Sequence, residues 1–274
     1  MPVLLLRRPS KNLAQGVVSS HIPDQRAQLD YGEALRQWQG YRAVFEAHGW
    51  ATQVVGDGDE GLPDAVFVED SVVAVKNLRG HGGAFILASP GSSMREAEIA
   101  AVDAHLAEAK AKNEMPGWSL VRIEKPGTLD GGDVLKVASE GRIYVGRSAR
   151  TNDEGIRQFT RAVEGLGWRV VVVPVSKALH LKSTVTALAD GTIIGAEALL
   201  DDVSLFNKFV AMPEPQGVAV VHLDEQGTKL LLSASAPRSA ELLRGMGYHV
   251  VTADISQFEI LEGCPTCLSV RVRV

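Results

Sequence analysis

The sequence predicts an α/β protein in which short strands and amphipathic helices alternate along the chain. Two observations lead to this prediction. Apolar residues recur at helical spacing in five segments, and each segment is followed by a glycine and then an apolar, strand-forming run. Glycine suits the left-handed position that closes a helix, and aromatic or β-branched residues favour the strand that begins there.

The elements are expected in a simple order. A first core strand begins at Pro2, the helices cover residues 25–48, 93–111, 153–166, 200–212 and 237–246, and the strands after them begin at Gly49, Gly117, Gly167, Gly217 and Gly247. These five recurrences suggest an internal repeat, although their intervals are unequal. Because any α/β protein can end its helices in glycine, the pattern alone leaves both interpretations open.

The composition favours a cytoplasmic protein that acts on a small molecule. Hydrophobic residues make up 45% of the 274 residues, enough for a sizeable core. No linker, charge block or low-complexity tract divides the chain, so we expect a single domain over residues 1–274. A net charge of −5 argues against nucleic acid and anionic membranes as partners. No apolar stretch approaches the roughly 18 residues that span a bilayer, and two cysteines do not make a disulfide framework.

The run TLDGGD at residues 128–133 is the most informative feature of the chain. Asp130 and Asp133 bracket two glycines ahead of an apolar run, so the backbone can approach a ligand closely and aim carboxylates at a shared space. Asp-Gly is also common turn chemistry, and the run alone decides nothing. An acid-ended strand pattern lies upstream at residues 63–70, and His180 and Cys267 follow downstream. Together these residues form a set of acid, acid, histidine and cysteine.

This set resembles the dimethylarginine dimethylaminohydrolase family of the guanidino-modifying, or pentein, superfamily. The stretches that match are FVED at 67–70, LDGGDV at 129–134, VG at 145–146 with RTN at 150–152, and LHLKS at 179–183. The resemblance extends over nearly the whole chain. It implies a five-bladed α/β propeller with pseudo-fivefold ββαβ repeats around a central active site. It also implies hydrolysis of Nω,Nω-dimethyl-L-arginine and Nω-monomethyl-L-arginine to L-citrulline and an alkylamine, with no metal or organic cofactor.

The catalytic roles implied by the resemblance suit a guanidinium substrate. Carboxylates hold such a cation by charge-assisted hydrogen bonds, and the candidates are Asp70 and Asp130, with Glu69 close by. Cys267 would be the nucleophile, because a bound cation favours its thiolate. His180 would protonate the leaving amine and then deprotonate water, and Asp130 could also orient its imidazole. From the residues alone, Cys267 could equally be a buried core residue and His180 an ordinary satisfied polar group.

The resemblance assigns the amino-acid end of the substrate to five further residues. Arg95 and Arg150 match arginines that hold the α-carboxylate, and arginine near a helix start is unfavourable for the helix dipole, which indicates another use. Asp64 matches a residue that holds the α-amino group. Leu261 and, more loosely, Val18 match residues that supply backbone carbonyls there. Residues 12–20, which contain glycine and serine, could form a flexible lid.

Cys264 and Cys267 form a Cys-x-x-Cys, a spacing that can indicate redox chemistry or zinc. The pair precedes the last strand instead of opening a helix, and no second cysteine pair completes a structural zinc site. We therefore interpret Cys264 as an accessory neighbour, able to trap Cys267 as a disulfide or to help an inhibitory zinc bind with His180.

Three other functions compete with the leading prediction. An arginine deiminase-like enzyme would act on free arginine, but such relatives are usually longer and have Arg-Asp where this chain has Glu69-Asp70. A non-catalytic pentein binding protein would lack the Cys/His pair. A thiol-redox protein would use the two cysteines. The sequence is compatible with a monomer and with a homodimer.

Overall fold

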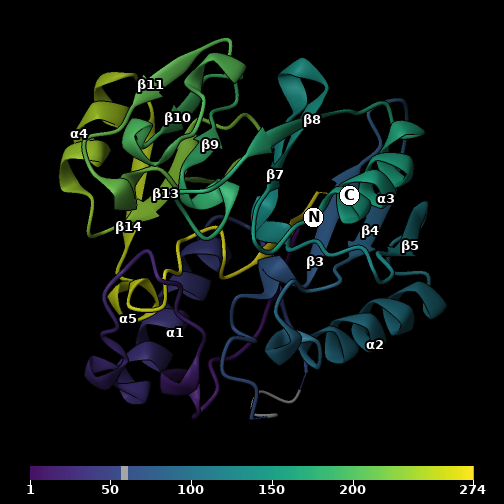
Figure 1. The fold of residues 1–274 in the computed structure, drawn as a ribbon, viewed down its shortest axis with the longest axis horizontal. Helices are drawn as coiled ribbons and strands as arrows, with labels where there is room; N and C mark the ends of the chain where they lie inside the picture. Colours follow the sequence, from purple (N-terminus) through teal and green to yellow (C-terminus); the bar gives the residue numbers. More distant parts are fainter. Residues whose placement is uncertain (57–60, 274) are drawn as a thin grey trace.

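Five three-stranded sheets surround the centre of the molecule in the computed structural model, which describes residues 1–56 and 61–273 (Figure 1). We call them blades 1 to 5. Their strands are, in blade 1, β15 (Val270–Val272), β1 (Val3–Leu6) and β2 (Ala51–Val54); in blade 2, β3 (Val72–Lys76), β4 (Gly83–Leu87) and β5 (Trp118–Arg122); in blade 3, β6 (Val134–Val137), β7 (Arg142–Arg147) and β8 (Arg169–Pro174); in blade 4, β9 (Val185–Ala187), β10 (Ile193–Gly195) and β11 (Phe209–Ala211); and in blade 5, β12 (Val221–His222), β13 (Lys229–Ser233) and β14 (His249–Ala253).

Every blade has the same topology. The first strand pairs antiparallel with the second, and the third pairs parallel with the second. Blade 1 takes its first strand from the end of the chain, with Leu4 opposite Arg271, so the first and last strands join the ring (Figure 1). The predicted pentein propeller of α/β repeats is confirmed.

Helices connect the second and third strands in four of the blades, because parallel neighbours require a long crossover. These helices are α1 (Tyr31–Ala47), α2 (Glu98–Ala111), α3 (Asp153–Glu164) and α4 (Pro237–Gly245), and a short helix that was not predicted, α5 (Ser256–Glu259), precedes β15. Two helices start at side-chain caps, where Asp30 accepts from the amide of Glu33 and Asn152 from that of Gly155. None of the described helices is long and apolar enough to cross a membrane.

Four of the five expected helix-closing glycines adopt the left-handed backbone. Gly49, Gly117, Gly167 and Gly247 have φ of 80°, 80°, 90° and 96°, as predicted. Gly217 differs, because it lies in the 3-10 turn Pro215–Gly217. A Cβ atom on Gly217 would lie 2.0 Å from the hydroxyl oxygen of Ser239 in α4, so the glycine allows this turn to pack closely against α4.

The predicted helix over residues 200–212 is wrong. The segment forms the 3-10 turn Val203–Leu205, in which Asp202 accepts from the amide of Ser204, and then strand β11. Its large apolar residues Leu200 and Phe206 are buried between blades 3 and 4. Their spacing therefore reflects a loop packed over the core, which apolar periodicity does not distinguish from a helix.

The core consists of five apolar clusters, one between each pair of neighbouring blades. Toward the centre, 3-10 turns precede the first strands of blades 2, 3 and 4: Val68–Asp70, Gly131–Asp133 and Leu181–Ser183. These turns contact one another. The candidate residues, far apart in the sequence, are therefore brought together where three first strands begin.

Candidate active site

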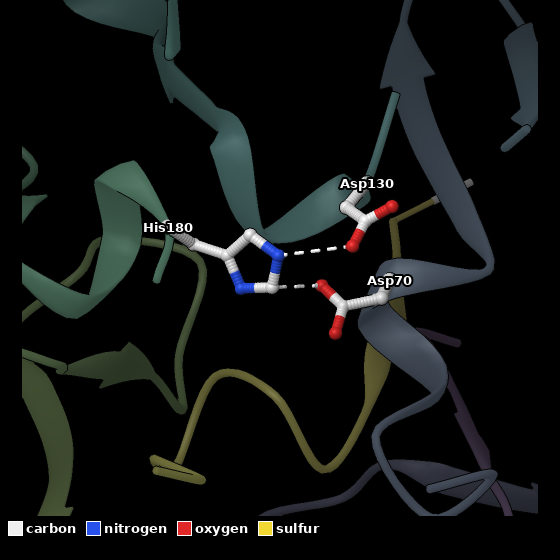
Figure 2. A group of neighbouring side chains, drawn as sticks. All are labelled: Asp70, Asp130 and His180. Atoms are coloured by element: carbon white, nitrogen blue, oxygen red, sulfur yellow. Dashed lines mark hydrogen bonds and ion pairs between the residues drawn. The ribbon is translucent and has the colours of Figure 1, made fainter. Parts of the chain in front are cut away.

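Three buried side chains from three blades converge at this centre. Figure 2 shows the buried imidazole of His180 facing the carboxylates of both Asp70 and Asp130. The Nε2 atom of His180 lies 3.1 Å from Oδ2 of Asp130, and its Nδ1 lies 3.9 Å from Oδ1 of Asp70. The imidazole is thus hydrogen-bonded at Nε2, while Nδ1 has only a longer ion-pair contact with Asp70.

The glycine pair of the TLDGGD run is required by this packing. A Cβ on Gly132 would lie 2.7 Å from Oδ1 of Asp70 and from the ring of His180. A Cβ on Gly131 would lie 2.0 Å from the carbonyl oxygen of Glu69. In return, the amide of Gly132 donates to Asp70 across 2.8 Å. The pair therefore allows a close approach to the neighbouring turns of the protein, whereas the sequence suggested a close approach to a ligand.

The charges around the histidine keep it protonated. Burial alone would lower the pKa of His180, but the carboxylate of Asp70 and the hydrogen bond to Asp130, with Asp133 nearby, raise it to about 9. Burial would raise the pKa of Asp70, yet His180, Arg95 and the Gly132 amide hold it well below its usual range. The free site therefore presents an imidazolium beside an ionised carboxylate at neutral pH.

Asp133 and Glu98 are two buried acids for which no catalytic or binding role was predicted. Asp133 accepts from the amide of Leu181 at 2.9 Å and from the hydroxyls of Ser148 and Thr151 at 2.7 Å each, which fixes the turn that carries His180. In the sequence, the only indication of a role for Asp133 was its place as the second acid of the DGGD run. Glu98 pairs with Arg95 three residues earlier, at 2.8 Å. Its position three residues after Arg95 was the only signal for it in the sequence.

The two predicted arginines are both paired with the central carboxylates. Arg95 Nη1 donates to Asp70 Oδ2 across 2.7 Å, and Glu98 anchors the rest of the guanidinium. Arg150 Nη1 lies 3.2 Å from Asp130 Oδ2. Both side chains are almost fully buried, so neither is an ordinary solvated surface arginine.

A small cavity of about 20 Å³ brings most of the predicted residues together. The predicted residues that line it are Asp64, Asp70, Arg95, Arg150, His180, Leu261 and Cys267. Asp130 does not line it; this carboxylate lies behind His180 and accepts from the Gly91 amide across 3.0 Å. Of the two roles considered for Asp130, the geometry supports orientation of the imidazole.

Part of the predicted lid covers this cavity. Val17 lines it and its amide donates to Asp64 Oδ2 across 3.0 Å, while burial raises the pKa of Asp64. Ser19 donates twice to the Glu262 carboxylate, at 2.7 and 2.6 Å. The side chain of Val18, whose backbone carbonyl was predicted to help hold the α-amino group, packs against the core cluster between blades 5 and 1. That position leaves the prediction about its carbonyl open.

Glu69 points away from the cavity, contrary to expectation. Its Oε1 lies 2.6 Å from both Lys182 Nζ and Arg271 Nη2, on the opposite side of the turn from Asp70. Adjacent residues of the tight turn project in different directions, and only Asp70 faces the cavity.

Cys267 is 8% exposed and unpaired, with its Sγ 2.9 Å from Sγ of Cys264. The contact with Cys264, burial and the carboxylates of Glu69 and Asp70 all raise the pKa of the Cys267 thiol. The empty cavity therefore holds this sulfur as a thiol, and an added cation would favour its ionisation.

Asp70, Asp130 and His180 also place ligand atoms within 4.8 Å of one another, which is close enough for a metal ion. Each carboxylate already pairs with an arginine, and His180 carries a proton at neutral pH. A metal would have to displace both arginines and the proton of His180, because metal ligands must be deprotonated.

No family model matches the chain. It is 50% identical over 269 residues to N(G),N(G)-dimethylarginine dimethylaminohydrolase of Streptomyces coelicolor, covering 98% of this chain and 96% of that protein. It is 29% identical over 278 residues to the enzyme of that name from Pseudomonas aeruginosa, covering 98% of each.

Solved structures agree with these relatives. A dimethylarginine dimethylaminohydrolase adduct with S-methyl-L-thiocitrulline matches with a TM-score of 0.82 and 28% identity over 98% of this chain and 99% of that one. A Pseudomonas aeruginosa enzyme complexed with citrulline matches with a TM-score of 0.81, 28% identity and 98% of each chain. The N-terminal domain of a cyanobacterial arginine dihydrolase, 15% identical with a TM-score of 0.83 over 99% of this chain and 98% of that domain, shares the fold.

Proposed function

This chain belongs to the dimethylarginine dimethylaminohydrolase family, and from that premise we propose that it hydrolyses Nω,Nω-dimethyl-L-arginine and Nω-monomethyl-L-arginine. The products are L-citrulline with dimethylamine or methylamine. The observation that carries the proposal is the buried cavity lined by Cys267, His180 and Asp70, a nucleophile, an acid–base group and a carboxylate for the substrate cation.

Substrate binding makes use of the charges around the cavity. The guanidinium lies against Asp70, whose carboxylate stays ionised. Arg95 and Arg150 provide positive charge for the α-carboxylate, and Asp64, with the backbone carbonyl of Leu261, holds the α-amino group. That all four residues line the cavity supports these roles. The cavity is too small for an amino acid in the free structure, so Val17 and Ser19 must move to admit the substrate.

The first chemical step forms a covalent adduct. The positive charge of the bound guanidinium offsets the negative charges of the carboxylates that raise the pKa of Cys267. The thiol of Cys267 then releases its proton to solvent. The thiolate attacks the guanidinium carbon. His180, protonated in the free enzyme, gives its proton to the dimethylamine nitrogen, and the C–N bond breaks to leave an S-alkylthiouronium on Cys267.

The second step hydrolyses that adduct. Neutral His180 takes a proton from water as the oxygen attacks the thiouronium carbon, and the C–S bond breaks. Citrulline is released, the sulfur leaves as a thiolate, and the second water proton passes to solvent. Asp130 acts here as a positioning residue, because its hydrogen bond holds the imidazole on Nε2 through both steps.

The experiment is a side-by-side assay of citrulline and released amine with asymmetric dimethylarginine, monomethylarginine and arginine. We expect citrulline and alkylamine in equal amounts from the methylated substrates. Citrulline and ammonia from arginine, with no product from the methylated substrates, would instead assign the deiminase activity. The cytoplasmic location and the monomeric or homodimeric state remain predictions.

A further inference from the structure

A second cavity, of about 320 Å³, lies at the other end of the first strands. In blades 2, 3 and 4 these strands begin at the 3-10 turns that form the site and run away from them. Residues of all five first strands, including Lys76, Lys136, Thr186, His222 and Arg271, line the cavity. We call it the axial pore. Its volume is in the range of small-molecule sites.

The lining of the axial pore is strongly cationic in a protein whose net charge is −5. Five of its residues are basic: Lys76, Lys136, Lys182, Arg271 and Arg273. A deeper cavity shares Lys136, Lys182 and Arg271 with it and adds one acid, Glu69. Clustered cations inside a concave, partly apolar wall concentrate the positive potential there.

Glu69 neutralises only part of this charge. Its Oε1 pairs with both Lys182 and Arg271, while its Oε2 is buried without a hydrogen bond in the described part of the chain. Among residues 1–56 and 61–273, no carboxylate forms an ion pair with Lys76 or Lys136. Lys136 Nζ donates to the carbonyl of Ala74 at 2.6 Å, which leaves two of its three protons for a ligand.

The proximity of these cations is costly without a counterion. Burial, together with Lys182 and Arg271, lowers the pKa of Lys136 to about 7. Lys76 and Lys136 are nonetheless accessible to solvent in the pore, so an anion can reach them. Trp50, Trp118 and Trp168 form part of the wall, and Arg273 stacks on Trp50 at 4.7 Å.

We propose that the axial pore is a binding site for a compact organic polyanion, a polycarboxylate or a diphosphate, held between Lys76, Lys136 and Lys182. Lysines suit this role because each offers several donors on a flexible stem to a multiply charged ligand. The Glu69, Lys182 and Arg271 cluster separates this site from the catalytic cavity. Because the five first strands enclose one such cavity, we expect one site per chain.

The test is calorimetric titration of the full chain with citrate and with pyrophosphate at constant ionic strength, with acetate as a monovalent control. We expect one saturable site, a change in tryptophan fluorescence and no binding of acetate. Binding of citrate alone assigns a carboxylate ligand, and binding of pyrophosphate alone a phosphate ligand. Absence of binding by both would overturn the proposal.

Variants locate the site. Lys136→Met and Lys76→Ala should each weaken binding at least about tenfold, because each removes a charge-assisted contact. Lys112→Ala removes the same charge just beyond α2, outside the pore, and should bind as wild type. Unchanged thermal unfolding would show that the pore variants fold. Binding that survives in both pore variants but disappears in Arg150→Ala would place the anion in the catalytic cavity and refute the proposal.

Discussion

Asp130 Oδ2 lies 3.1 Å from His180 Nε2 and 3.2 Å from Arg150 Nη1. One oxygen of one carboxylate therefore holds both the acid–base group and an arginine at the substrate cavity. The second oxygen accepts from the Gly91 amide, which leaves the carboxylate little freedom to rotate. If Arg150 moved toward a substrate carboxylate, Asp130 Oδ2 would keep only the hydrogen bond that His180 Nε2 donates to it.

The protonation of His180 can be measured directly. By NMR of labelled histidine side chains, His180 should titrate near pH 9, whereas burial lowers the pKa values of His105 and His222 and makes them internal controls. Asp70→Asn should shift the His180 midpoint to lower pH, because the largest favourable charge is lost. The stabilisation from this raised pKa is complete below about pH 6.5 and is lost as the pH rises through about 9. A His180 midpoint near 6.5 in the wild type would contradict this account.

His180→Ala should separate the two halves of the chemistry. A haloacetamidine, whose leaving group needs no proton, should still label Cys267, while turnover of methylarginine should fall by roughly 10²–10⁴-fold or more. Intact-mass measurement and citrulline release test the two halves. Near-wild-type turnover would make His180 a structural histidine.

Arg150→Ala should mainly weaken binding of substrates that carry an α-carboxylate. A charge-assisted contact to an anion contributes on the order of 1.5–3 kcal/mol, so KM for monomethylarginine should rise by one to two orders of magnitude. A methylated guanidine without the carboxylate is the matched control and should lose much less. Equal KM for wild type and variant on monomethylarginine would remove Arg150 from the substrate site.

The two cysteines should form a reversible disulfide on oxidation. Their sulfur atoms are 2.9 Å apart, so diamide can accept two electrons and two protons from the thiols without large movement of the chain. Activity should disappear on treatment and return with dithiothreitol, and Cys264→Ser should stay active throughout. Rapid loss of activity in Cys264→Ser under the same treatment would argue against this pairing.

The fold was predictable where local rules and family motifs agreed. Glycine after an apolar helix identified the left-handed positions at Gly49, Gly117, Gly167 and Gly247. The same rule failed at Gly217, because blade 4 replaces its helix with a packed loop and apolar spacing alone does not reveal the difference. The pairing that closes blade 1 depends on contacts between the two ends of the chain, which no local pattern encodes.

The candidate site was less completely predictable because side-chain direction depends on the tertiary packing. Glu69 and Asp70 are neighbours with the same charge, yet Asp70 lines the catalytic cavity and Glu69 meets Lys182 and Arg271 below it. Roles that come from burial among partners, such as that of Asp133, became visible only when blades 3 and 4 were placed together.

The central claim is that Cys267 attacks the guanidinium carbon of a methylated arginine. Citrulline and dimethylamine should be measured from asymmetric dimethylarginine with wild type, Cys267→Ser and Cys264→Ser, after thermal unfolding has shown that all three are folded. We predict equal amounts of both products from wild type, most of that activity in Cys264→Ser, and none in Cys267→Ser, because the serine hydroxyl has too high a pKa to be ionised by the bound cation. Turnover by Cys267→Ser, or equal loss of activity in both variants, would contradict the assignment of the nucleophile.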